Sequence, residues 1–238
     1  MLPWIRSPYY TGKPNVKCMI THVTQKHELH DSTYWGPVMR IWGIMEGGQS
    51  VLLRIRNFMP YFYTIIPPDI NIVEFRKQLD RDLTDKLTKR HVVPPDGKNK
   101  YIFNVEAVQK TILMGFHCKK QLMYKITLTA TGQIRPLMDL LEKRYNFPTF
   151  EGTIAYTMRF MIDHKIACCQ WINIPEGERY IVPKNKRVSK CDCELLIKFS
   201  SVLEPLSTVE HSYVAPIRIM SFDIECCKIG RGFVIPEL

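Results

Sequence analysis

The sequence predicts an α+β chain with a β-rich N-terminal part, and three observations support this prediction. Apolar and polar residues alternate in several short runs, as they do in half-buried strands. One longer segment, residues 69–87, repeats its apolar residues at helical spacing. With 238 residues the chain is long enough for one large or two modest domains, and its 45% of apolar residues is enough to form a packed core.

The first part of the chain is predicted to consist of strands. A tight turn at Gly47–Gly48 separates the second strand from the third, and Pro67 ends the fourth because proline cannot donate to a strand ladder. The predicted strands are Cys18–Thr24, Met39–Ile44, Val51–Arg56 and Phe58–Ile66.

Helices and further strands follow. Residues 69–71 can cap a helix whose apolar positions are Ile72, Phe75, Leu79, Leu83 and Leu87. Residues 89–100 are polar and contain Pro and Gly, which predicts an exposed loop. After this loop we predict strands at Tyr101–Val108 and Leu122–Thr129, and a second helix at Gln133–Tyr145.

Residues 51–145 therefore follow most of a β-α-β-β-α-β order, with both helices expected on one face of an antiparallel sheet. This order is typical of RNA-recognition-like domains, which stack bases on exposed aromatic side chains. Tyr101 and Phe103 alternate on a predicted strand and are candidates for stacking, although at least one of them could belong to the core. We expect this subdomain to be inserted between β-rich segments 1–50 and 146–214.

The segment after residue 146 is expected to contain a short helix and further strands. The predicted elements are a helix at Ile154–Ile162 and strands at Trp171–Ile174, Arg179–Pro183 and Cys193–Val202. A basic loop, Lys184–Lys190, lies between the last two strands; it can contact phosphates, act as a transport signal or simply form a solvated turn. The candidate DNA-binding residues are Lys98, Lys100, Tyr101, Lys184, Lys186, Arg187 and Lys190.

The composition narrows the possible partners. Lys and Arg number 33 against 23 Asp and Glu, which gives a net charge of +10 and suits nucleic acid or an acidic membrane surface. A basic protein without a polyanionic partner fits this charge equally well.

The eight Cys residues show no Cys-x-x-Cys pair, and no stretch is apolar enough for a signal peptide or a membrane span. We therefore expect a soluble, intracellular protein with no membrane partner.

Two carboxylates near the end of the sequence are candidates for metal binding. Asp223 and Glu225 are two positions apart in Met220–Glu225, at the end of the apolar run that begins at Ile217. We predict a strand here, so both side chains would share one face. Two carboxylates on an apolar strand resist burial unless a cation neutralises them, and oxygen ligands favour Mg²⁺ or Mn²⁺. The alternative is that both lie on a solvent-exposed face. We place a domain boundary near Ala215.

The sequence around these carboxylates, Ser221-Phe-Asp-Ile-Glu-Cys226, resembles the first exonuclease motif of the family B DNA polymerases. The same resemblance, in matching order, covers roughly residues 39–236. The other segments that carry it are Pro60-Tyr-Phe-Tyr63, Ile154–Asp163 with Trp171, Asn185–Lys190 with Cys191, and Ala215–Met220. One departure is visible at Cys226–Glu237, which is longer than the usual connection.

The resemblance implies a replicative DNA-directed DNA polymerase with 3′→5′ proofreading, located in the nucleus. It implies that Asp223 and Glu225 are catalytic metal ligands for Mg²⁺ or Mn²⁺ and that residues 215–238 begin an RNase H-like exonuclease domain. Template and primer-template DNA, other polymerase subunits and a sliding clamp are the implied partners. Because the remaining ligands would follow Leu238, we expect the chain alone to be inactive. The alternative is a stand-alone module that binds single-stranded nucleic acid without catalysis.

Overall fold

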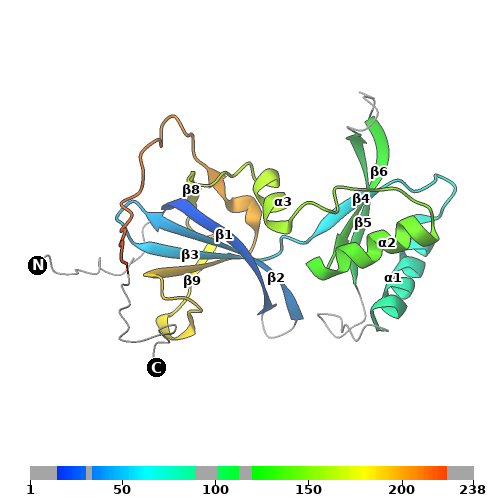
Figure 1. Ribbon diagram of the computed structural model, residues 1–238, viewed down its shortest axis with the longest axis horizontal. Coiled ribbons are helices and arrows are strands. Elements are labelled where there is room, and N and C mark those ends of the chain that lie inside the picture. Colours follow the sequence, from blue (N-terminus) through cyan, green and yellow to red (C-terminus); the bar gives the residue numbers. More distant parts are fainter. Residues whose placement is uncertain (1–14, 31–33, 89–100, 113–119, 224–238) are drawn as a thin grey trace, which may run out of the picture.

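The computed structural model describes residues 15–30, 34–88, 101–112 and 120–223, and these residues form two curved sheets with helices beside them (Figure 1). Among the described residues, no helix is both long and apolar enough to cross a bilayer. The predicted loop at residues 89–100 and the residues after Asp223 lie outside the described ranges.

The larger sheet has seven strands in the order β11-β8-β1-β2-β3-β10-β9. The strands β3 and β10 pair in parallel, and all other neighbours in this sheet are antiparallel. The sheet thus combines strands from residues 16–55 with strands from residues 171–205. Its strands are β1 Val16–His30, β2 Tyr34–Met45, β3 Ser50–Ile55, β8 Trp171–Ile174, β9 Arg179–Ile181, β10 Cys193–Ile197 and β11 Glu204–Pro205.

The smaller sheet has four antiparallel strands in the order β5-β6-β4-β7. The helices α1 (Ile72–Thr88) and α2 (Ile134–Arg144) lie beside it, so the element order from β4 to β7 is β-α-β-β-α-β. The strands are β4 Tyr61–Thr64, β5 Ile102–Thr111, β6 Lys120–Leu128 and β7 Thr149–Phe150.

The strand at Val51 was expected to open this smaller unit, and the structure corrects that expectation. β3, which contains Val51, pairs with β2 and β10 in the larger sheet. The first strand of the smaller sheet is β4, which begins at Tyr61, ten residues after Val51. Both strands are apolar and fully buried at most positions, so their composition does not reveal which sheet each one joins.

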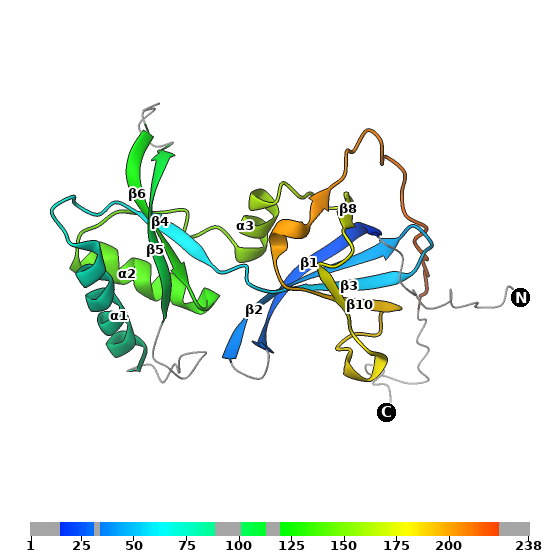
Figure 2. The same cartoon turned by 180° about the vertical axis from the view of Figure 1, so that it is seen from behind.

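The two faces of the smaller sheet enter two different cores. Phe62 and Ile126 pack with Leu79 and Leu83 of α1 beneath the helices. Tyr61 and its neighbours on the other face join the core of the larger sheet, together with side chains of α3 (Tyr156–Asp163). The helix α3 lies between the two sheets in both views (Figure 1, Figure 2). The core is therefore continuous from one sheet to the other.

Local sequence explains how α1 begins and which face it buries. The Asn71 side chain accepts hydrogen bonds from the backbone N–H groups of Val73 and Glu74, at 3.0 and 3.3 Å, and so caps the helix. The predicted apolar positions Phe75, Leu79, Leu83 and Leu87 are all buried. Similarly, the predicted turn before β3 is present: Gly48 has φ +81° and its N–H donates to the Met45 carbonyl at 2.9 Å.

The apolar run that begins at Ile217 does not form the predicted strand in its described part. Residues 217–223 belong to no helix or strand. Ile219 and Phe222 are 88% and 72% exposed. A strand needs a hydrogen-bonded neighbour to satisfy its backbone groups, and no strand of the described residues pairs with this segment.

Candidate functional site

The structure tests only half of the predicted carboxylate pair. Asp223 is exposed at the end of the described chain, whereas Glu225 lies outside the described residues. Within the described ranges, no group of three or more His, Cys, Asp or Glu side chains is placed to hold a metal ion. The oxygen donor that Asp223 offers is of the type that Mg²⁺ and Mn²⁺ prefer, but one carboxylate does not make a binding site for either ion.

The basic loop between β9 and β10 is folded, with a 3₁₀ turn at Lys184–Lys186. The predicted contact residues Lys184, Lys186 and Lys190 are exposed on this loop. Arg187 behaves differently, because its guanidinium donates hydrogen bonds to backbone carbonyls within the same loop. Its Nε donates to Val182 at 3.2 Å, and its Nη1 donates to Cys191 and Asp192 at 3.2 and 3.0 Å. Lys98 and Lys100, the other predicted basic contacts, lie outside the described residues.

A buried carboxylate holds the basic loop against the larger sheet. Glu194 of β10 is 0% exposed, and its Oε2 accepts hydrogen bonds from the Val188 and Ser189 N–H groups at 3.0 and 3.2 Å. The Ser189 hydroxyl donates to the same oxygen at 3.0 Å, and Arg54 Nη1 pairs with Oε1 at 3.1 Å. A buried carboxylate costs several kcal/mol unless it is paired in this way, so Glu194 strongly favours this loop conformation. Sequence reasoning missed Glu194, because its only local signal is an acidic residue within an apolar strand.

Arg54 also belongs to a second ion-pair group on the same sheet. It pairs with Glu28 of β1, whose carboxylate also accepts a 2.7 Å hydrogen bond from Arg40 Nε. Burial opposes ionisation of Glu28, but the hydrogen bonds and charges of Arg54 and Arg40 outweigh it and hold the pKa of Glu28 below its ordinary value. Two carboxylates and two arginines thus connect β1, β2, β3 and β10.

Tyr101 and Phe103 were candidates for base stacking, with the core as the alternative for at least one of them, and the structure places Tyr101 in the core, so this residue is not available as a DNA contact. Its side chain is 0% exposed in the core beneath α1 and α2, whereas Phe103 is 59% exposed. The register of β5 and β6 shifts between Ile102 and Asn104, and such an irregularity interrupts the alternation that would have placed both rings on one face. A carboxylate oxygen of Asp80 also accepts the N–H groups of Tyr101 and Ile102, both at 3.1 Å.

The face of the smaller sheet opposite α1 and α2 carries two tyrosines that the sequence analysis did not assign to a site. Tyr61 and Tyr63 are 9% and 5% exposed and lie beneath cationic side chains. Lys125 Nζ is 4.5 Å from the Tyr61 ring centroid, and Lys110 Nζ is 5.1 Å from that of Tyr63. Burial, followed by the hydrogen bond to Asp163, raises the pKa of Tyr61. These rings are covered and do not form an open stacking surface.

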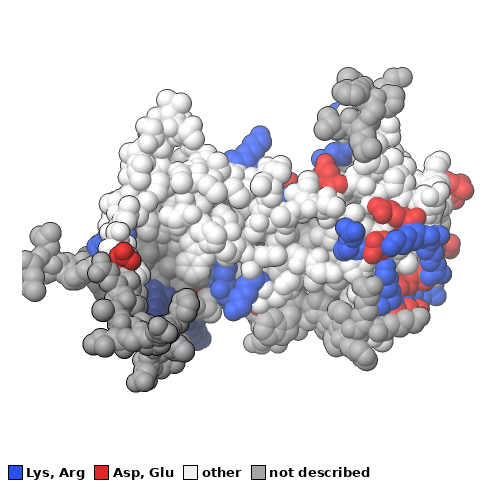
Figure 3. Space-filling view, in the orientation of Figure 1, with Lys and Arg blue, Asp and Glu red and all other residues white. Residues whose placement is uncertain are grey.

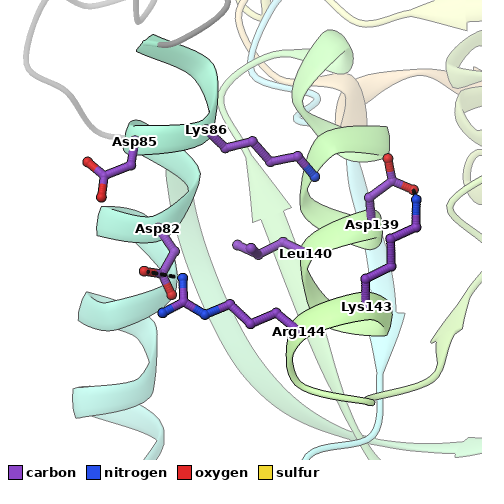
Figure 4. Close-up of a pocket in the computed structure, with 7 residues that line it drawn as sticks. All are labelled: Asp82, Asp85, Lys86, Asp139, Leu140, Lys143 and Arg144. Atoms are coloured by element: carbon purple, nitrogen blue, oxygen red, sulfur yellow. Dashed lines mark ion pairs between the residues drawn. The ribbon is translucent and has the colours of Figure 1, made fainter.

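A groove lined by residues of α1 and α2 lies on the helical side (Figure 4). Its charges neutralise one another: Arg144 pairs with Asp82 at 2.9 Å, and Lys143 pairs with Asp139 at 3.7 Å. Lys86 donates to the Pro136 carbonyl at 2.8 Å. Figure 3 likewise shows acidic and basic side chains mixed over this end of the molecule. The groove therefore does not present the single sign of charge that a phosphate backbone requires.

Two sequence families match the chain. Residues 57–135 match the family described as DNA polymerase delta catalytic subunit-like, N-terminal domain. Residues 147–237 match the family described as DNA polymerase family B, exonuclease domain. The two matches follow each other along the chain and include the segments on which the resemblance rests.

Individual proteins agree with these families. The DNA polymerase delta catalytic subunit of Plasmodium falciparum is 33% identical over 212 residues, which are 83% of this chain and 19% of that protein. The corresponding subunit of Arabidopsis thaliana is 30% identical over 227 residues, or 90% of this chain and 20% of that protein. The chain thus spans about a fifth of the length of the curated relatives that it matches.

A solved structure shares the fold. The family B DNA polymerase of the archaeon Pyrobaculum calidifontis aligns with a TM-score of 0.56 and 18% identity, over 80% of this chain and 20% of that one. The fold, the two family matches and the curated relatives lead to one assignment. The chain belongs to the family B DNA polymerases and is homologous to the N-terminal and exonuclease region of the delta catalytic subunits.

Proposed function

We propose that this chain forms the DNA-binding N-terminal region, and supplies the first exonuclease carboxylates, of a replicative DNA polymerase with 3′→5′ proofreading. The observation that carries the proposal is the order of the features. The motif Ser221–Cys226 falls inside residues 147–237, which match the exonuclease family, and residues 57–135 before it match the N-terminal family of the delta subunits.

We also propose that the smaller unit is an RNA-recognition-like subdomain inserted into the β-rich domain, and that an RNase H-like exonuclease fold begins near Ala215. Two features support the insertion. Strands from both sides of the smaller unit pair within one seven-stranded sheet, and the smaller sheet has the β-α-β-β-α-β order.

In this proposal Asp223 and Glu225 bind Mg²⁺ or Mn²⁺ together with carboxylates from later exonuclease motifs. The bound ions would supply the activation of water and the stabilisation of the leaving oxygen in phosphodiester hydrolysis. Because two carboxylates alone cannot hold both ions, the chain by itself is proposed to have neither nuclease nor polymerase activity. Other polymerase subunits and a sliding clamp are the proposed protein partners, and the nucleus is the proposed location.

The test uses the full-length polymerase that contains this chain. We expect Asp223→Ala and Glu225→Ala each to lower the rate of 3′-end degradation by more than about a hundredfold while primer extension is retained. Glu210→Ala is the matched control, because Glu210 is an exposed carboxylate on the same connection before the motif. Unchanged 3′-end degradation in both motif variants would exclude the proposed role of these carboxylates.

A further inference from the structure

We propose that residues 183–192 form a preformed phosphate-binding loop in which the basic side chains have two separate tasks. Lys184, Lys186 and Lys190 contact phosphates of single-stranded DNA. Arg187 and Glu194 do not touch DNA and instead hold the loop in its binding conformation. This inference rests on the proposed DNA-binding function and assigns it to particular residues.

The three lysines are exposed on a short stretch of backbone. Within the described part of the chain, no carboxylate forms an ion pair with Lys186 or Lys190. An exposed ammonium group binds phosphate as a point charge and needs no fixed geometry of its own. Lysines at such positions therefore suit a sequence-independent contact with the DNA backbone.

Arg187 is held inward by the loop itself. Its hydrogen bonds reach the carbonyl of Val182, before the 3₁₀ turn, and the carbonyls of Cys191 and Asp192, just before β10. The guanidinium thus joins the two ends of the loop. A lysine at this position would keep the charge but would lose the planar arrangement of donors that reaches all three carbonyls.

Glu194 and Asp192 fasten the loop to the larger sheet. Glu194 accepts two backbone N–H groups of the loop and pairs with Arg54 of β3. Asp192 Oδ2 accepts hydrogen bonds from the Ser50 N–H and hydroxyl groups, each at 2.9 Å. A loop fixed in this way loses little conformational entropy when it binds, which favours affinity.

The same contacts argue against the loop as a linear transport signal. A receptor that read Lys184–Lys190 as an extended peptide would have to break the three hydrogen bonds of Arg187 and expose the buried carboxylate of Glu194. Phosphate contact requires no such rearrangement.

The experiment measures binding of a fluorescein-labelled oligothymidylate to the 238-residue chain across a series of salt concentrations. Each of Lys184→Ala, Lys186→Ala and Lys190→Ala should weaken binding and reduce the slope of log K against log salt by about 0.7, the contribution of one phosphate contact in a single strand. Lys77→Ala is the matched control, because Lys77 is exposed on α1, away from the loop, and its variant should leave the slope unchanged.

Glu194→Gln separates positioning from simple electrostatics. Removal of a negative charge near three lysines would strengthen DNA binding if electrostatic attraction alone mattered. If Glu194 positions the loop, the variant should weaken binding several-fold and accelerate amide hydrogen exchange at Val188 and Ser189. Arg187→Lys should also weaken binding although its charge is kept. Ser189→Ala removes the hydroxyl that donates to Glu194 and accepts the Cys191 N–H, and it leaves the two backbone N–H groups on Glu194. It provides a milder variant if Glu194→Gln does not fold.

The outcomes distinguish this inference from the proposed function. If the unaltered chain shows no salt-dependent binding to the oligonucleotide, the proposed DNA-binding role of the chain fails. If the unaltered chain binds but the three lysine variants keep its affinity and slope, the chain binds DNA elsewhere and the loop assignment is wrong. Tighter binding by folded Glu194→Gln would overturn the positioning role.

Discussion

At the scale of single residues, Glu28 makes the stability of the protein depend on pH. Its pKa in the folded protein lies below the ordinary value of 4.5, because the hydrogen bonds and charges of Arg54 and Arg40 outweigh its burial. The stabilisation is therefore complete above about pH 4.5 and is lost as the pH falls through the lowered pKa. Urea unfolding of the wild-type chain between about pH 6 and pH 3 should show this loss.

Glu28→Gln is the comparison for that measurement, since glutamine keeps a hydrogen-bond acceptor but does not titrate. We expect this variant to be less stable near neutral pH, because Arg40 and Arg54 lose a shared counter-charge. Its free energy of unfolding should change less than that of the wild type over the same acidic range. Identical pH profiles would show that other carboxylates carry the acid sensitivity.

Two tyrosine hydroxyls allow a comparison of the free energy that is lost when a hydrogen-bond acceptor is left without its donor. The Tyr156 hydroxyl donates to the Phe58 carbonyl in the buried core, and the Tyr61 hydroxyl donates to the exposed carboxylate of Asp163 at 2.5 Å. Tyr156→Phe leaves a buried carbonyl without this donor, so we expect a loss of about 1–3 kcal/mol. Tyr61→Phe should cost only about 1 kcal/mol, because water can solvate Asp163. Denaturant unfolding of both variants checks the order, and an equal or reversed order would contradict it.

At the scale of elements, the start of α1 depends on one side chain. Asn71→Ala removes the acceptor for the Val73 and Glu74 N–H groups, and we expect it to lower the free energy of unfolding by about 1 kcal/mol. Asn71→Asp is the control, because aspartate caps equally well and adds a favourable negative charge at the helix N-terminus. An alanine variant as stable as the aspartate variant would show that tertiary packing alone fixes this end of α1.

The elements also show which parts of the fold can be predicted from sequence. The helix α1 was predictable because its apolar spacing and its cap are local signals. The predicted turn at Gly47–Gly48 is a local signal for the pairing of β3 with β2, whereas the parallel pairing of β3 with β10 was not predictable, since β10 lies far away in the sequence. The sequence also left open which of Tyr101 and Phe103 is buried, because the irregularity after Ile102 depends on pairing with β6.

The candidate DNA-binding loop shows the same limit. Charge alone identified Lys184, Lys186 and Lys190, which are exposed, and it also selected Arg187, whose donors are used within the loop. Every residue has a backbone carbonyl, so the sequence does not show which carbonyls accept hydrogen bonds from an arginine. An arginine that binds carbonyls therefore cannot be distinguished by sequence from one that faces solvent. The role of Glu194 depends on Arg54, which comes from a distant strand.

At the scale of the whole molecule, α3 contributes side chains to a core that the two sheets share. Phe160 of α3 is 0% exposed and packs edge-to-face against Phe58, with ring centroids 5.0 Å apart. These rings belong to a core that includes Ile41 of the larger sheet and Tyr63 of the smaller one. A shared core of this kind predicts that the two sheets unfold together.

Phe160→Ala tests this cooperativity. The substitution leaves a cavity between the sheets and should lower the free energy of unfolding by about 3–5 kcal/mol. If the sheets form one cooperative unit, hydrogen exchange through global unfolding should accelerate by the same factor in β2 and in β6. Leu83→Ala is the matched comparison, because Leu83 is equally buried but lies in the separate core beneath α1. In a cooperative molecule it too accelerates exchange in both strands, whereas loss of protection in β6 alone would show that the smaller unit unfolds independently.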